Sequence, residues 1–569
     1  MSIRRFAALS LPALILLSAA APAAATDREP RLGLTIRPAV ENGLAASLEV
    51  EIRFDLPDGA FKPLFLPERL GPLFHIADRI EEVTAADESG PLEMAMTSGE
   101  RKTGDATQLG DKIRLWTPAR PARGVVTVRY RARVSREMMA GPSWEVRSEP
   151  RGVSAAGNTF LLLPDDRTAY RIKLRWDLAA MPAGSRSITS LPSDIETRPI
   201  TADGLREAYF MAGDLFMTRG DGPFRAASTA DTPYDQMELL NWTAEAYGKM
   251  LKFFGPPPQP TFTVMFRGSR ISRASGTELP GALMATMMPG TPLDEVKLLA
   301  SHEMVHVFLN GLDPEPWFAE GLAVVYQNRA PFMTGLIGED AYIADVNATA
   351  RAYYRNVRFG MPMKEAQASF WTDARARLQP YVRGGMYFCL VDAELKAATG
   401  GRRGLDAVMR EFLARRDAGG SVTVSDWLEL VARDLGPAAQ SGYEAMMSGR
   451  KIVLPSDAFG PCFRRVEERV PVFELGFDPV SLAASPRVIK GLDPRSPAAA
   501  AGLREGDKIV WATSQDTAQE KYGEPMTLKV ERGGGAIVEI RFLPHGRMTD
   551  GYQWRRFKRP CSSLPPDRR

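Results

Sequence analysis

The stretch His302-Glu303-Met304-Val305-His306, followed by Glu320, decides how this chain of 569 residues is interpreted. Residues four apart lie on one face of an α-helix, so His302 and His306 can offer two imidazole nitrogens to one metal ion. A catalytic zinc usually takes three protein ligands and keeps its fourth position for water. Glu320 is the natural third ligand, which leaves Glu303 free to act as a base. The sequence therefore predicts one Zn²⁺ per chain, held by His302, His306 and Glu320.

The residues around this motif indicate a buried helix. The chain has only four histidines, and two of them stand here among apolar neighbours such as Leu299 and Phe308. Thr291 and Pro292 are expected to cap and begin a helix over about 292–310. A motif this short can also arise by chance or for solvation. Two imidazoles and a carboxylate on an inner face are nevertheless costly to bury without a partner, and a cation answers that need.

The amino terminus indicates export. Arg4 and Arg5 precede an apolar run, and the small residues behind it offer a signal-peptidase cut after Ala23 or Ala25. We assign 1–25 to a signal peptide, because the run is too short to favour a membrane anchor. No other stretch is apolar enough to cross a bilayer, so we expect no stable membrane span in the mature chain. The expected location is the periplasm or the outside of the cell.

Cysteine usage agrees with an oxidising compartment. Cys462 and Cys561 flank the C-terminal segment, each directly after a proline. We predict that they pair, which would contribute on the order of 4 kcal/mol by closing a long loop. Cys389 stands in an apolar helical run and is expected to be a small buried hydrophobe. None of the three is placed to bind the zinc.

Net charge gives no reason to expect a nucleic-acid partner. The chain carries 72 basic and 69 acidic residues, a formal charge of +3. Its length implies about three domains once the signal is removed.

The hydrophobic period changes along the chain and divides it into blocks. Residues 26–222 alternate with period two and predict an antiparallel β-sandwich domain. Residues 223–458 are mainly helical and carry the zinc motif. Two apolar strands over 260–266 and 282–288 precede the zinc helix, which places a sheet edge beside the metal where an extended peptide could add as a strand. Further helices are predicted over 235–254, 340–358, 381–399, 404–415 and 424–435.

Residues 462–561 resemble a PDZ domain. The specific part is the string Ser496-Pro497-Ala498 with Ala501-Gly502-Leu503 and Gly506-Asp507 behind it. Glu474-Leu475-Gly476-Phe477 resembles the loop whose backbone amides hold the terminal carboxylate of a peptide. The resemblance implies that peptide C-termini bind at Leu475, Gly476 and Phe477.

These three blocks, in this order, resemble the PDZ-containing glycyl aminopeptidase family of gluzincin zinc metallopeptidases. The likeness covers nearly the whole mature chain and extends to Tyr381-Val382-Arg383-Gly384, which looks like the family's Tyr-x-Lys-Gly segment. It implies a multidomain α+β protein with a thermolysin-like catalytic domain. It also implies peptide hydrolysis with Glu303 as general base and Tyr381 as hydrogen-bond donor to the tetrahedral oxyanion. The expected function is that of an exported aminopeptidase acting on peptides or unfolded proteins.

Two departures from the family keep other functions open. Thirteen residues separate His306 from Glu320, fewer than the family uses. Aminopeptidases of this type place an acidic residue on the edge strand to bind the substrate amine, whereas the expected edge strand Gly281–Thr286 has none. Glu278 is the nearest carboxylate. The alternatives are a zinc endopeptidase of narrow specificity and a catalytically inactive PDZ adaptor or holdase that binds exposed C-termini.

Overall fold

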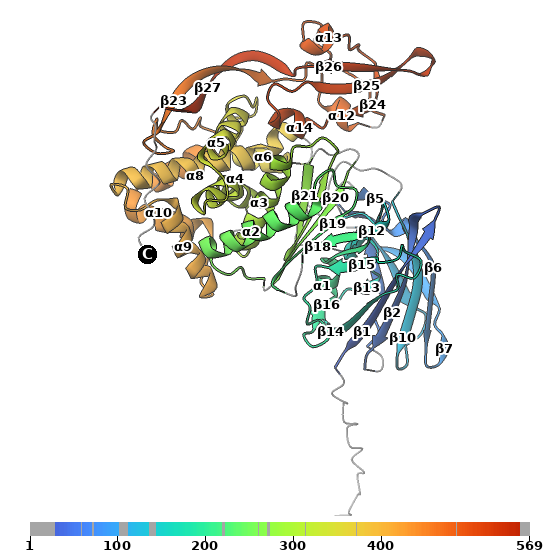
Figure 1. Ribbon diagram of the computed structural model, residues 1–569. Helices are drawn as coiled ribbons and strands as arrows, with labels where there is room; N and C mark the ends of the chain where they lie inside the picture. Colours follow the sequence, from blue (N-terminus) through green and yellow to red (C-terminus); the bar gives the residue numbers. More distant parts are fainter. Residues whose placement is uncertain are drawn as a thin grey trace, which may run out of the picture.

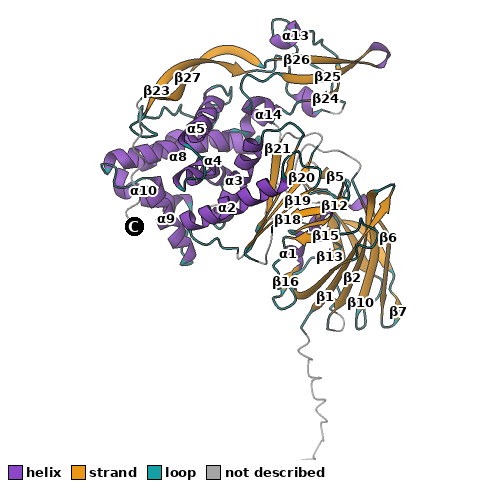
Figure 2. Cartoon of the chain, viewed as in Figure 1, coloured by secondary structure: helices purple, strands orange, loops and turns teal. Residues whose placement is uncertain are grey.

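The structure is a computed structural model with three consecutive regions (Figure 1). A sheet-rich N-terminal region is followed by a helical region built on a small sheet, and long strands form the C-terminal region (Figure 2). The predicted multidomain α+β class is thereby confirmed. The residues that the structure describes are 29–57, 60–70, 73–101, 112–135, 144–218, 222–259, 261–269, 274–312, 315–370, 373–484 and 486–557. The predicted signal peptide and Cys561 lie outside them. Within this part of the chain, every helix is too short or too polar to cross a lipid bilayer.

The N-terminal region is built around a seven-stranded sheet with the order β16-β14-β1-β2-β10-β6-β7. Alternate residues of its central strand β2 are buried, as the period-two pattern predicts. The strands span Ile200–Thr201 (β16), Ala169–Trp176 (β14), Arg31–Glu41 (β1), Leu44–Asp55 (β2), Val126–Arg133 (β10), Ile80–Asp87 (β6) and Gly90–Pro91 (β7).

One pairing in this sheet corrects the prediction of a wholly antiparallel domain. β14 runs parallel to β1, with Leu34 opposite Leu174. Parallel neighbours need a long crossover, and here the chain passes through other sheets before it returns. One of these smaller sheets consists of β11 (Arg147–Glu149), β12 (Gly152–Ala156), β17 (Tyr209–Gly213) and β15 (Arg186–Thr189). The other consists of β13 (Leu163–Pro164), β3 (Leu64–Pro67), β9 (Lys112–Pro118) and β8 (Met94–Glu100). All share one buried apolar core.

The helical region is built on a five-stranded sheet with the order β18-β19-β20-β22-β21. Leu283 and Ala285 of β22 face the helices, whereas Ala282 and Met284 belong to the core of the N-terminal region. The sheet therefore lies between the two regions, as Figure 1 shows. Its strands are β18 (Leu215–Met217), β19 (Phe224–Thr229), β20 (Phe262–Gly268), β21 (Ala274–Leu279) and β22 (Ala282–Met287). Because β18 pairs with β19, the sheet begins ahead of the predicted domain boundary at 222.

The predicted edge strand is wrong. β22, which was expected to border the metal site, is flanked by β20 on one side and β21 on the other. Among the described strands, β21 is the outer strand on this side of the sheet, and it pairs antiparallel with β22 across a turn at Pro280 and Gly281. Ala274 to Leu279 contains small and polar residues without a strong strand pattern, which explains why this strand was missed.

Ten helices are described in this region, and the five predicted beside the zinc helix all form, with α5 ending at Tyr354 instead of 358. A turn begins there, in which Oδ1 of Asn356 accepts from the backbone amide of Arg358. The helices are α2 (Gln236–Phe254), α3 (Leu293–Leu309), α4 (Pro316–Met333), α5 (Glu339–Tyr354), α6 (Met363–Ala368), α7 (Ala374–Arg377), α8 (Gln379–Ala398), α9 (Leu405–Asp417), α10 (Val424–Leu435) and α11 (Ala438–Met447).

The C-terminal region consists of a long two-stranded ribbon and a three-stranded sheet. β23 (Phe463–Phe473) pairs with β27 (His545–Arg556), and β24 (Lys508–Ala512), β25 (Met526–Arg532) and β26 (Ala536–Phe542) form the sheet. Short helices α12 (Val480–Ala483), α13 (Pro497–Ala500) and α14 (Gln515–Glu520) complete the region. The PDZ identity of this region stays a prediction.

Helix α14 joins the C-terminal region to the helical region. Asp516 pairs with Arg377 of α7 at 2.8 Å, and Lys521 pairs with Glu295 in the first turn of α3 at 2.9 Å. Nε2 of the buried Gln519 donates to the carbonyl of Ala374. The C-terminal region thus contacts the helix that carries the zinc motif.

Candidate metal centre

Helices α3 and α4 bring the three predicted zinc ligands together. Helix α3 has eight buried residues, whereas His302 and His306 are half-buried. The helix begins at Leu293 with Pro292 as its N-cap, and no side chain caps it, so the predicted Thr291 cap is wrong by one residue. Pro292 occupies the cap because its extended backbone ends the preceding turn.

The three ligand atoms form a nearly equilateral triangle. Nε2 of His302 lies 3.3 Å from Nε2 of His306, and each lies 3.3 Å from Oε2 of Glu320. Three donors on a tetrahedron with bonds of about 2.0 to 2.1 Å are about 3.3 Å apart. The donor types and spacing therefore suit a tetrahedral Zn²⁺ with one open position. Within the described residues, these three side chains are the single group of His, Cys, Asp or Glu close enough to hold a metal ion.

The charges of this cluster depend on one another. Burial alone would raise the pKa of Glu320, but the two histidines hold it well below its usual range. Burial would lower the pKa of His306, yet the Glu320 carboxylate raises it to about 10. An ionised carboxylate and two nitrogen donors that attract positive charge form a site with a strong demand for a cation.

A second layer of hydrogen bonds orients His302. Its Nδ1 lies 2.9 Å from Oε1 of Gln327, and Nε2 of Gln327 donates to both carboxylate oxygens of Asp345 at 3.0 and 3.2 Å. This arrangement makes Nδ1 the protonated nitrogen and leaves Nε2 free for a metal. Neither Gln327 nor Asp345 was predicted from the sequence. The available signal was spacing, because Gln327 follows Glu320 by two helical turns on the same face of α4.

Glu303 lies against the edge strand. A Cβ atom at Gly276 of β21 would lie 2.9 Å from Oε1 of Glu303 and 3.1 Å from its Cγ. Only glycine leaves this space, so the absence of a side chain at 276 lets the carboxylate stand between the metal cluster and the strand. Burial raises the pKa of Glu303, which favours its use as a proton acceptor near neutral pH.

Glu278 occupies the same face of the edge strand. Residues two apart on a strand point to the same side, so the side chain of Glu278 faces α3 as the position of Gly276 does. Burial, opposed by His306 and reinforced by Glu303 and Glu320, raises the pKa of Glu278 to about 7. From the sequence, Glu278 is only the carboxylate nearest to the expected edge strand 281–286, which contains none. The structure instead places it on the edge strand itself.

Tyr381 lies beside the cluster as the resemblance implied. Its ring stacks on that of His302 with centroids 6.1 Å apart, and its hydroxyl hydrogen-bonds to Glu320. A close helix crossing places it there, because a Cβ at Gly321 of α4 would lie 2.6 Å from the carbonyl carbon of Gly384. Burial raises the pKa of Tyr381 well above its usual value, so the hydroxyl keeps its proton.

Leu475, Gly476 and Phe477 lie apart from this cluster. Leu475 and Phe477 are buried in the apolar core of the C-terminal region, and Gly476 has φ +79° with its Cα facing Ser496. Within the described residues, their backbone amides donate to no protein acceptor. Cys462 is disulfide-bonded, and Cys389 is the free cysteine of the described chain. Cys561, the predicted partner of Cys462, lies outside the described residues.

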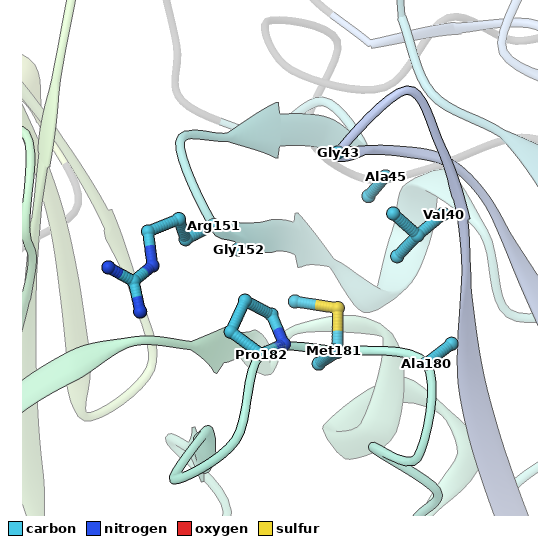
Figure 3. A pocket seen from close by; sticks show the side chains of 8 residues that line it. All are labelled: Val40, Gly43, Ala45, Arg151, Gly152, Ala180, Met181 and Pro182. Atoms are coloured by element: carbon cyan, nitrogen blue, oxygen red, sulfur yellow. The ribbon is translucent and has the colours of Figure 1, made fainter.

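A separate pocket lies in the N-terminal region. Figure 3 shows its lining, which includes Val40, Arg151 and Met181, and its volume is about 240 Å³. None of its lining residues belongs to the metal cluster or the edge strand.

Comparison with known proteins finds a likeness in fold. No protein-family model and no curated protein matches the sequence. An aminopeptidase N family protein from Idiomarina loihiensis has a similar structure, with a TM-score of 0.63 and 15% identity over 92% of this chain and 98% of that one. An M1 zinc metallopeptidase from Deinococcus radiodurans aligns with 75% of this chain and 94% of its own at 17% identity, with a TM-score of 0.42. The chain therefore has the overall fold of the aminopeptidase N family protein.

Proposed function

We propose that this chain is an exported zinc aminopeptidase that removes residues from the amino end of peptides or unfolded proteins. The observation that carries the proposal is the triangle of ligand atoms of His302, His306 and Glu320, each 3.3 Å from the others, with Glu303 beside it and Glu278 on the edge strand. The fold shared with an aminopeptidase N family protein supports it.

Zinc at this site would be held by His302, His306 and Glu320, and it would acidify a water molecule and polarise the scissile carbonyl. Glu303 accepts the proton of the attacking water and returns it to the leaving amine. The protonated hydroxyl of Tyr381 donates a hydrogen bond to the developing oxyanion. The free edge of β21 binds the extended substrate by main-chain hydrogen bonds.

Glu278 favours an aminopeptidase over an endopeptidase. Its side chain lies on the face of the edge strand that Glu303 of α3 contacts at Gly276, and the amino end of a short bound strand would lie there. An incoming ammonium group would favour the ionised form of a carboxylate whose pKa burial has raised to about 7. The strand 281–286 lacks an acidic residue for the substrate amine, and this absence had left an endopeptidase as an alternative function. In the proposed function, Glu278 on the neighbouring strand β21 is that acidic residue.

The C-terminal region is proposed to be a PDZ domain that binds peptide carboxylates at Leu475, Gly476 and Phe477. The unpaired amides of this loop within the described chain support the assignment. Fluorescence anisotropy with a peptide that ends in a free carboxylate, compared with the same peptide amidated, tests it. Equal binding of both peptides would contradict a carboxylate site.

One experiment tests the catalytic proposal. Zinc-loaded full-length mature protein is incubated with a mixed peptide library in which every sequence is present with a free and with an acetylated amino end. We expect mass spectrometry to find residues removed one at a time from free amino ends only. A chelator should stop the reaction and added zinc should restore it, while Glu303→Gln protein should be inactive. Internal cuts, or cleavage of acetylated peptides, would identify an endopeptidase instead.

A further inference from the structure

A buried tyrosine of the N-terminal region hydrogen-bonds to the edge strand. Tyr209 begins β17, is fully buried, and donates its hydroxyl hydrogen to the carbonyl of Thr277 at 3.0 Å. The carbonyl of Thr277 and the amide of Glu278 belong to one planar peptide group. A bond to this carbonyl therefore fixes the orientation of the peptide unit that carries Glu278.

The tyrosine itself is held rigidly. The backbone amide of Tyr209 donates to Oγ of Ser190 at 2.8 Å, and its carbonyl accepts from the amide of Ser190 and from Oγ1 of Thr189. Burial raises the pKa of Tyr209 well above its usual value, with Glu303 and Glu278 adding to the shift, so the hydroxyl remains a donor. The hydroxyl of a residue whose backbone is anchored in this way holds the peptide unit that it binds.

The edge strand is thus contacted from both faces at consecutive residues. Glu303 lies against Gly276 on the side of α3, and Tyr209 binds Thr277 from the N-terminal region. An edge strand lacks the support of a second neighbouring strand, and these contacts to its faces add support while they leave its edge available to a substrate. A buried ion pair ties the two regions together nearby, where Arg267 of β20 meets Glu145 at 3.2 Å and Glu149 at 3.5 Å.

We infer that Tyr209 is a positioning residue which, through the Thr277 carbonyl, holds Glu278 where it binds the substrate amine, so that the N-terminal region sets the requirement for a free amino end. This inference rests on the proposed aminopeptidase function. It assigns to the N-terminal region a role in substrate selection in addition to its structural role.

Two inhibitors that differ in a single amine test this inference. Leucine hydroxamate carries the α-amine, and 4-methylpentanohydroxamate lacks it. Inhibition constants are measured on the zinc-loaded full-length protein, on Tyr209→Phe and on Glu278→Gln. Tyr130→Phe is the matched control, because it removes another buried tyrosine hydroxyl of the same region, which accepts from the amide of Leu162 at 3.1 Å.

We expect Tyr209→Phe to weaken binding of leucine hydroxamate by roughly 3- to 10-fold, the loss associated with one hydrogen bond. Binding of the compound without the amine should change less than about twofold, and Tyr130→Phe should change neither. Glu278→Gln should abolish the preference for the amine.

The possible results of these inhibition measurements distinguish the role of Tyr209 from the proposed aminopeptidase function. If Tyr209→Phe leaves the preference intact while Glu278→Gln removes it, the role of Tyr209 is refuted and the aminopeptidase function stands. Equal weakening of both inhibitors by Tyr209→Phe would also refute the role, because it would indicate general damage to the site. A wild-type protein that does not prefer the amine would overturn the proposed function and this inference with it.

Discussion

Nδ1 of His302 and Oε1 of Gln327 lie 2.9 Å apart, and the other end of the Gln327 amide binds Asp345. The neutral amide of Gln327 thus connects the His302 imidazole to the Asp345 carboxylate. Its oxygen requires a proton on Nδ1, and its nitrogen satisfies a buried carboxylate that burial has given a pKa of about 6. The imidazole is thereby held in the tautomer that a metal can bind.

Replacing Gln327 by Leu should weaken zinc binding by about 10- to 100-fold, as is typical for residues that orient a metal ligand. Competition with a chromophoric chelator measures this affinity. Asn328→Ala is the control, because Asn328 also binds Asp345 but is given no role at His302. Unchanged zinc affinity in Gln327→Leu would contradict the orienting role.

Replacing Glu303 and replacing His306 should have different effects on the zinc content of the protein. Glu303→Gln keeps the three ligand atoms and should retain one zinc per chain while kcat falls by about 10²- to 10⁴-fold, the usual contribution of a general base. His306→Ala removes a ligand and should lose both zinc and activity. Elemental analysis of protein purified without chelator, together with kcat, distinguishes the two. A Glu303→Gln protein with full turnover would exclude Glu303 as the base.

The zinc helix was predictable because its signal is local. His302 and His306 lie four residues apart on one helix, Glu320 completes a stretch of 19 residues, and the structure brings the three together. The edge strand was not predictable in the same way. Ala274 to Leu279 has little strand propensity, and it is held in place by β22 and by Tyr209, a residue 68 positions earlier.

The long-range pairing of the N-terminal region was hidden for the same reason. The strand patterns of β1 and β14 identified both strands, but nothing in either shows that Leu34 lies opposite Leu174 in parallel. Alternation fixes which face of a strand is buried and leaves its neighbour and direction open.

Gly276→Ala should reduce kcat without removing zinc. The added Cβ would lie 2.9 Å from Oε1 of Glu303, so the carboxylate or the edge strand must shift. A displacement of about 1 Å in a reacting group can cost about 10²-fold in rate. Gly33→Ala is the matched control, since a Cβ on this other strand glycine meets its nearest atom at 3.6 Å. Equal kcat values for the two variants would show that Gly276 is not needed for close approach.

Tyr381→Phe should lower kcat by about 10²- to 10³-fold and leave zinc content unchanged, because one oxyanion donor is lost. The ring and its stacking on His302 are kept. Tyr354→Phe, which removes a buried hydroxyl bonded to the carbonyl of Ile452, should leave kcat near the wild-type value. A change in KM alone would place Tyr381 in substrate binding instead of oxyanion stabilisation.

Thiol titration should distinguish the three cysteines. Burial raises the pKa of Cys389 to about 12, so at pH 8 only about one part in ten thousand is thiolate and the native protein should react slowly with thiol reagents. The thiolate fraction increases with pH, so the reaction should become faster as the solution is made more alkaline. In denaturant without reductant, we expect one reactive thiol per chain if Cys462 and Cys561 are paired. With reductant, all three cysteines should react. Three thiols in denaturant alone would contradict the predicted disulfide, and rapid reaction of the native protein would contradict the raised pKa of the Cys389 thiol.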